Sequence, residues 1–74
     1  MKISPYFVYT GSSQCVMGTY TSKAVGNYYH ILWEDTKKEE CYSIEIIDIC
    51  VKQNLWVPAK TLQEVLMIKI KHSK

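Results

Sequence analysis

The chain has 74 residues and a mass of 8.6 kDa. At this length we expect one domain over residues 1–74, and two independent hydrophobic cores are excluded. Apolar residues make up 47% and charged residues 22%, which is typical of a folded protein rather than a disordered one. A catalytic core with a cofactor fold and a substrate pocket does not fit in this length, so we do not expect an enzyme.

The N-terminal residues lack the apolar core and the cleavage site of a secretory signal. No apolar run approaches the roughly 20 residues of a membrane helix. The chain has three cysteines, Cys15, Cys41 and Cys50, with no C-x-x-C pair, which does not suit a disulfide framework. We therefore expect a cytoplasmic protein with reduced, mostly buried thiols. A zinc site that adds the two histidines is less favoured, because no pair has finger-like spacing.

The first half of the chain predicts β-strands. We expect them at residues 3–9, 14–21, 27–34 and 40–43, with a polar hairpin tip before the fourth. Pro5 indicates an edge or a bulge at the start of the first strand, and Gly18 a bulge or bend in the second. In the third strand Tyr29, Ile31 and Trp33 share one face. Bulky residues also occupy its other face, so we expect both faces to be covered, one by the core and the other by a helix or a partner.

From Ser43 the apolar residues recur at intervals of three and four, which predicts a helix over residues 44–54. Ser43 suits the N-cap and Asn54 the C-cap. A strand over residues 44–51 is the alternative, because β-branched residues dominate there. We prefer the helix because of the spacing.

Residues 56–58 are expected to interrupt the helix and to begin the last third of the chain. A short helix over residues 59–67, starting near Thr61, and a closing strand over residues 68–72 are expected to follow. Four to five strands with one helix near residues 44–54 predict an α+β fold. The expected architecture is a small curled antiparallel sheet of the SH3-like or Tudor-like kind.

Charge is unevenly distributed. Residues 34–48 hold six of the seven acids and two lysines, a net charge of −4, whereas the rest of the chain carries +6. These acids are either solvated at an exposed turn or docked on a basic groove of another protein. For the second interpretation the candidate partner-binding residues are Glu34, Asp35, Glu39 and Glu40, with Trp33 and Tyr42 alongside.

All nine basic residues are lysines, so sequence-specific DNA binding, which relies on arginine, is disfavoured. Lys69, Lys71 and Lys74 offer an alternative function, nonspecific binding of a nucleic-acid backbone by an SH3-like module. The same alternating lysines would also protect an edge strand from aggregation.

The nine aromatic residues are too many to bury in so small a core. Surface Tyr and Trp are common interface anchors, so we expect a homodimer. An aromatic cage for a methylated lysine is also conceivable.

Motifs for nucleotide binding, metal-dependent hydrolysis and serine hydrolysis are absent, so no catalytic residue, cofactor or metal is expected. Cys41 and His30 can be paired as a nucleophile and a base, but no third orienting group is evident in the sequence.

Gln63, Leu66 and Met67 match part of the Gln-x-x-Leu-aromatic or Met peptides that dock on bacterial sliding clamps, although we expect these residues in the core. In general character the chain resembles small host-takeover proteins of phages that infect low-GC Gram-positive bacteria, including sliding-clamp inhibitors of staphylococcal phages. The shared traits are lysine without arginine, many Tyr and Ile residues and one tiny domain without catalytic motifs. The resemblance implies a dimeric inhibitor in the host cytoplasm that binds the replicative clamp and keeps it off DNA.

Overall fold

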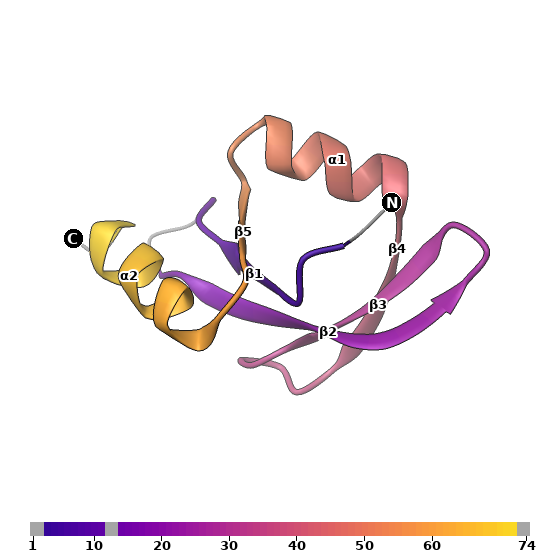
Figure 1. Cartoon of the computed structure of the whole chain (residues 1–74), viewed down its shortest axis with the longest axis horizontal. Coiled ribbons are helices and arrows are strands. Elements are labelled where there is room, and N and C mark those ends of the chain that lie inside the picture. Colours follow the sequence, from indigo (N-terminus) through magenta and orange to yellow (C-terminus); the bar gives the residue numbers. More distant parts are fainter. Residues whose placement is uncertain (1–2, 12–13, 73–74) are drawn as a thin grey trace.

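The structure is a computed structural model that describes residues 3–11 and 14–72. It is an α+β fold with a five-stranded antiparallel sheet, in the order β4-β3-β2-β1-β5, and two helices (Figure 1). The elements are β1 (Tyr6–Tyr9), β2 (Val16–Val25), β3 (Tyr28–Trp33), β4 (Glu39–Ser43), α1 (Ile44–Lys52), β5 (Trp56–Ala59) and α2 (Leu62–His72). In the described part of the chain the sheet is open, with β4 and β5 as its edges. The α+β class is therefore confirmed.

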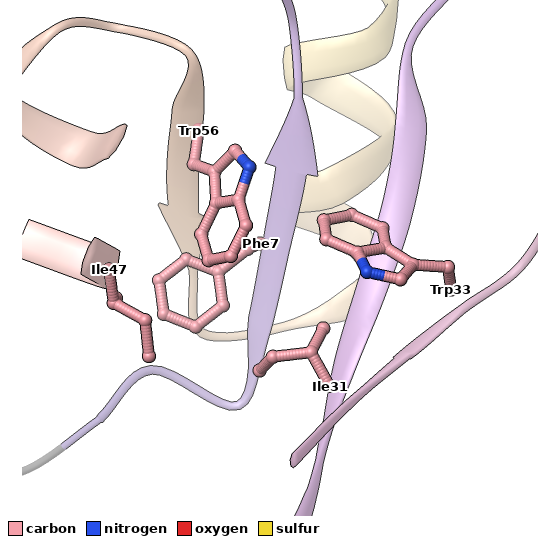
Figure 2. Close-up of a cluster of buried hydrophobic side chains, with 5 residues drawn as sticks. All are labelled: Phe7, Ile31, Trp33, Ile47 and Trp56. Atoms are coloured by element: carbon pink, nitrogen blue, oxygen red, sulfur yellow. The ribbon is translucent and has the colours of Figure 1, made fainter. Parts of the chain in front are cut away.

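The larger hydrophobic core lies between the sheet and α1. It consists of Phe7, Ile31, Trp33, Ile47 and Trp56, contributed by β1, β3, α1 and β5 (Figure 2). Because side chains alternate along a strand, the residues next to Phe7 face the other side of the sheet. There Val8 packs with Ala59 and with Val65 of α2 in a smaller second cluster. The two helices therefore cover opposite faces of the sheet.

Gly18 lies in regular pairing opposite Trp33, so the bulge predicted at this glycine is wrong. A Cβ atom at Gly18 would lie 2.7 Å from Ile31 Cγ2 and 2.8 Å from Trp33 Cζ3. The glycine therefore makes room for the core. The register shift lies further along β2, between Tyr20 and Ala24, where the strand continues to Val25 beyond its expected end.

Two prolines have positions that the sequence did not predict. Pro5 precedes β1, which pairs with both β2 and β5, so the expected edge position of this strand is wrong. The segment Trp56–Ala59, expected as a break, is strand β5 and pairs with β1. Pro58 is tolerated there because β5 is an edge strand, where a missing N–H need not leave a neighbouring strand unpaired.

Helix α1 confirms the helical interpretation of its segment. The Ser43 side chain accepts a hydrogen bond from the Ile46 N–H at 3.3 Å, as expected for the N-cap. The C-cap is Gln53 rather than Asn54, which adopts a left-handed conformation with φ 61°. The Asn54 N–H donates to Val51 O and the following N–H to Cys50 O, the bonding pattern of a Schellman motif.

Helix α2 runs through His72, so the closing strand predicted for residues 68–72 is wrong. The Thr61 hydroxyl accepts a hydrogen bond from the Glu64 N–H, and Glu64 reaches back to the Lys60 N–H. This cap starts a helix at the expected place. The helix continues because Val65 and Ile68, three residues apart, both pack in the second cluster.

The far face of β3 is less covered than expected. Tyr28 and Leu32, which alternate with the core residues, are 55% and 40% exposed. Within the described residues α2 contacts β1 and β5, at the other end of the sheet. The helix expected as one possible cover of this face does not lie over β3 in the described residues, and cover by a partner stays a prediction.

Candidate functional site

A hollow of about 640 Å³ opens on the α1 face of the sheet. Its aromatic walls come from four strands: Tyr9 of β1, Trp33 of β3, Tyr42 of β4 and Trp56 of β5. The β3–β4 register places Trp33 and Tyr42 on one face, because Tyr42 pairs with Tyr29 and Trp33 follows Tyr29 by an even number of residues. The sheet thus gathers aromatic rings that are distant in sequence.

Three of these rings stand nearly perpendicular to one another. The centroids of Trp33 and Trp56 are 5.3 Å apart with planes at 69°. Tyr42 lies 4.9 Å from Trp56 and 6.3 Å from Trp33, at 87° in both cases. Such edge-to-face contacts are favourable, and three mutually inclined planes form a rigid corner.

Tyr42 links the aromatic walls to a carboxylate. Trp33 Nε1 donates a hydrogen bond to the Tyr42 hydroxyl at 2.9 Å, and that hydroxyl donates to Glu40 Oε2 at 2.7 Å. Burial, together with the hydrogen bond to Glu40, raises the pKa of Tyr42 to about 12 despite the opposing effect of the Trp33 bond. The phenol therefore remains a hydrogen-bond donor at neutral pH and orients Glu40 at the rim of the hollow.

The rim of the hollow carries Asp35 and Glu40 together with Lys38. Asp35 Oδ1 accepts the Thr36 N–H at 2.8 Å. Neither carboxylate forms a salt bridge within residues 3–11 and 14–72. Two carboxylates against one ammonium give the rim a net negative charge, which suits a cationic group.

The other two candidate docking acids lie on the opposite face of the sheet, and both are paired. Glu34 Oε2 lies 2.7 Å from Lys69 Nζ of α2 and also accepts the Met17 N–H. Burial raises the pKa of Glu34, but these hydrogen bonds and the lysine charge outweigh it and lower the pKa below its ordinary value. Glu39 Oε1 lies 3.5 Å from Lys23 Nζ and 3.2 Å from His30 Nδ1.

The expected cluster of docking residues is therefore divided between the two faces. Alternation along β3 and β4 places Glu34 and Glu39 on the far face, whereas Trp33, Asp35, Glu40 and Tyr42 meet at the hollow. Sequence reasoning missed Tyr9 and Trp56 as parts of this site. For Trp56, the aromatic and β-branched pair Trp56–Val57 was a strand signal, but the following proline outweighed it.

The lysines of the alternative function differ from their expected arrangement. Lys69 is paired with Glu34, and Lys71 is exposed on a helix rather than on a strand. Lys74 lies outside the described residues. Leu66 and Met67, expected in the core, are 60% and 63% exposed on α2.

Protein-family models, curated proteins and solved structures were compared with the chain, and none of them matches it. Neither described helix is long and apolar enough to cross a membrane. In the described part of the chain no group of three or more His, Cys, Asp or Glu side chains is placed to hold a metal ion.

Proposed function

We propose that the protein is a non-enzymatic, phage-encoded inhibitor that acts in the host cytoplasm. It docks the β3–β4 hairpin on a basic, nucleic-acid-binding surface of a host protein such as the replicative DNA sliding clamp, and blocks loading of that protein on DNA. The observation that supports this proposal most is that Asp35 and Glu40, which form no salt bridge with any described residue, lie beside an aromatic hollow.

The hollow offers two kinds of attraction to a basic side chain of the partner. The half-buried rings of Tyr9 and Tyr42 line the hollow and attract a cation by their quadrupoles, and the carboxylates add charge-assisted hydrogen bonds. Surfaces that hold nucleic acid are rich in Lys and Arg, so they present such side chains in number. The docking residues of this proposal are Asp35 and Glu40 with Trp33 and Tyr42, while Glu34 and Glu39 contribute less because their charges are compensated.

We also propose that the protein forms a homodimer. The outward side of α2 exposes Leu62, Leu66, Met67 and Ile70, which are 55 to 74% accessible. An apolar stripe of this kind on a small monomer is typical of an interface, and a second copy would cover it. The dimer leaves the hollow free, because α1 and α2 lie on opposite faces of the sheet.

The SH3-like character of the sheet is also part of this proposal. The ten-residue strand β2 pairs with both β1 and β3, and its register shift lies midway along the β2–β3 pairing. A long strand with an irregularity at its middle is a usual device for bending a small sheet. Nonspecific nucleic-acid binding by the C-terminal lysines is less favoured, because Glu34 compensates Lys69.

The test measures binding to a purified sliding clamp of a Gram-positive host by calorimetry, at low and high ionic strength. The double variant Asp35→Asn/Glu40→Gln should weaken binding by about tenfold or more, since removing charges at a docked interface costs on the order of 1–3 kcal/mol. Its matched control is Glu34→Gln/Glu39→Gln, which removes the same charge from the other face and should change affinity less than about threefold.

Equal losses in the two double variants would contradict the hollow as the docking site. Failure of the unmodified protein to bind the clamp at low ionic strength would remove the clamp as the partner. A gel shift with DNA at low ionic strength, absent from a Lys71→Gln variant, would instead support the nucleic-acid alternative.

A further inference from the structure

A second group of reactive side chains lies on the sheet face away from the hollow. His30 and Cys41 are opposite each other in the β3–β4 ladder, so their side chains lie together on one face. Cys41 Sγ is 3.4 Å from His30 Nδ1 and 3.5 Å from His30 Nε2. Glu39 Oε1 lies 3.2 Å from His30 Nδ1, and Lys23 Nζ of β2 lies 3.5 Å from the same carboxylate oxygen.

Glu39 is the third, orienting group, which the sequence did not reveal beside His30 and Cys41. A nucleophile, a base within reach of it and a carboxylate that orients the base are the three parts of an activated thiol. With the ring proton on Nδ1, that N–H donates a hydrogen bond to Glu39 Oε1, and the lone pair of Nε2 is left for the thiol. The sulfur lies at nearly equal distances from the two ring nitrogens, so the ring has to turn for Nε2 to face it.

Cys41 is also the most accessible of the three cysteines in the described structure. It is exposed, whereas Cys15 and Cys50 are half-buried. Burial raises the pKa of the Cys50 thiol, which disfavours its reactive form. Helix α2 packs on β1 and β5 and leaves the β3–β4 end of this face uncovered, so a small reagent can reach the sulfur.

We propose that Cys41 is a modification site, a nucleophilic thiol that forms mixed disulfides with low-molecular-weight disulfides, with His30 as its base and Glu39 as a positioning residue. His30 takes the thiol proton, and the thiolate attacks one sulfur of the disulfide. A sulfur–sulfur bond forms to Cys41 as the bond of the reagent breaks. The other half leaves as a thiolate, which takes up the proton. Cys41 is oxidised and the released half of the reagent is reduced.

The contacts of the His30 ring place the three groups of this site within reach of one another. The ring contacts both the Cys41 sulfur and the Glu39 carboxylate. Lys23 compensates part of the Glu39 charge, which would otherwise repel the thiolate. The residues differ from those of the hollow, so this proposal does not rest on the proposed function.

The test uses glutathione disulfide and follows mixed-disulfide formation at each cysteine by intact mass and peptide mapping from acidic to alkaline pH. Near neutral pH we expect Cys41 to react at least about tenfold faster than Cys15 and Cys50, because reactivity follows the thiolate fraction and access. His30→Gln should remove this advantage near neutral pH, whereas at alkaline pH the variant and the unmodified protein should react alike. Cys41→Ser should abolish modification at this position.

Glu39→Gln is the second variant, chosen because it keeps the side-chain size, and circular dichroism of each variant checks that it is folded. It should reduce the rate by less than His30→Gln and shift the pH profile. A Cys41 rate in the folded protein no higher than that of an unstructured peptide with the same sequence would overturn the proposal. An unchanged rate in a folded His30→Gln variant would overturn it as well.

Discussion

The two faces of the sheet differ in how much apolar surface they bury. The face covered by α1 contributes more to stability, whereas the face covered by α2 leaves reactive side chains accessible. The α1 face holds five buried residues, of which three are aromatic and come from three different strands. The α2 face holds three smaller ones, Val8, Ala59 and Val65. Apolar area removed from water contributes roughly 25 cal/mol per Å², so the α1 face supplies the larger share of the hydrophobic stabilisation.

The consequence for function follows from this asymmetry. On the α1 face the rings that stabilise the fold also wall the hollow. On the α2 face the thin cover leaves polar groups accessible, including His30 and Cys41, and leaves the outer side of α2 exposed. Substitutions on the two faces should therefore differ in their cost to stability, with Trp56 the most costly and Leu66 the least.

Trp56→Ala should produce the largest loss of stability. The side chain is 5% exposed and packs against Phe7, Trp33 and Tyr42. Removing a buried Trp leaves a cavity and costs about 3–5 kcal/mol. Urea unfolding followed by circular dichroism measures this cost. The control on the other face is Val65→Ala, which deletes two carbons and should cost on the order of 1–2 kcal/mol. A larger loss for the valine would contradict the ranking of the two faces.

Glu34→Gln should have a smaller effect, and one that depends on pH. The pKa of Glu34 is lowered in the folded protein, so its stabilising contribution is present above the pKa of the unfolded chain and is lost as the pH falls through the folded value. Because the ion pair with Lys69 is partly exposed, the contribution is below about 1 kcal/mol.

Urea unfolding of Glu34→Gln and the unmodified protein, compared at neutral and acidic pH, checks this prediction. The stability difference should be present at neutral pH and shrink at acidic pH. A difference that grows on acidification would show that the folded protein does not favour the ionised carboxylate.

Leu66→Ser should change the stability of the monomer least, within about 0.5 kcal/mol, because the side chain is 60% exposed. Its expected effect is on self-association instead. Sedimentation over a range of protein concentrations should show weaker dimerisation than in the unmodified protein. Dimerisation unaffected by this change would place the interface elsewhere than on α2.

Several elements of the fold are predictable because their signals are local. Ser43 caps α1 with its own hydroxyl, and Thr61 does the same for α2, so both helix starts depend on residues within one turn. The third strand follows the two-residue alternation of its own side chains, and composition and turn residues mark the other three. Residues 68–72 show the limit of such patterns, because Ile–Lys–Ile–Lys alternates like a strand while the contacts of Val65 and Ile68 keep it helical.

The candidate site could not be predicted in the same way, because its residues are far apart in the sequence. Length and residue spacing predicted one small α+β domain, and the charge pattern located its acids between residues 34 and 48. Only the tertiary structure decided which face each acid occupies, which of them Lys69 and Lys23 compensate, and that Trp56 joins Trp33 and Tyr42 around one hollow. Alternation and capping depend on residues that are neighbours along the chain. Strand pairing and helix docking bring together residues that are far apart in sequence, and no local pattern indicates their contact.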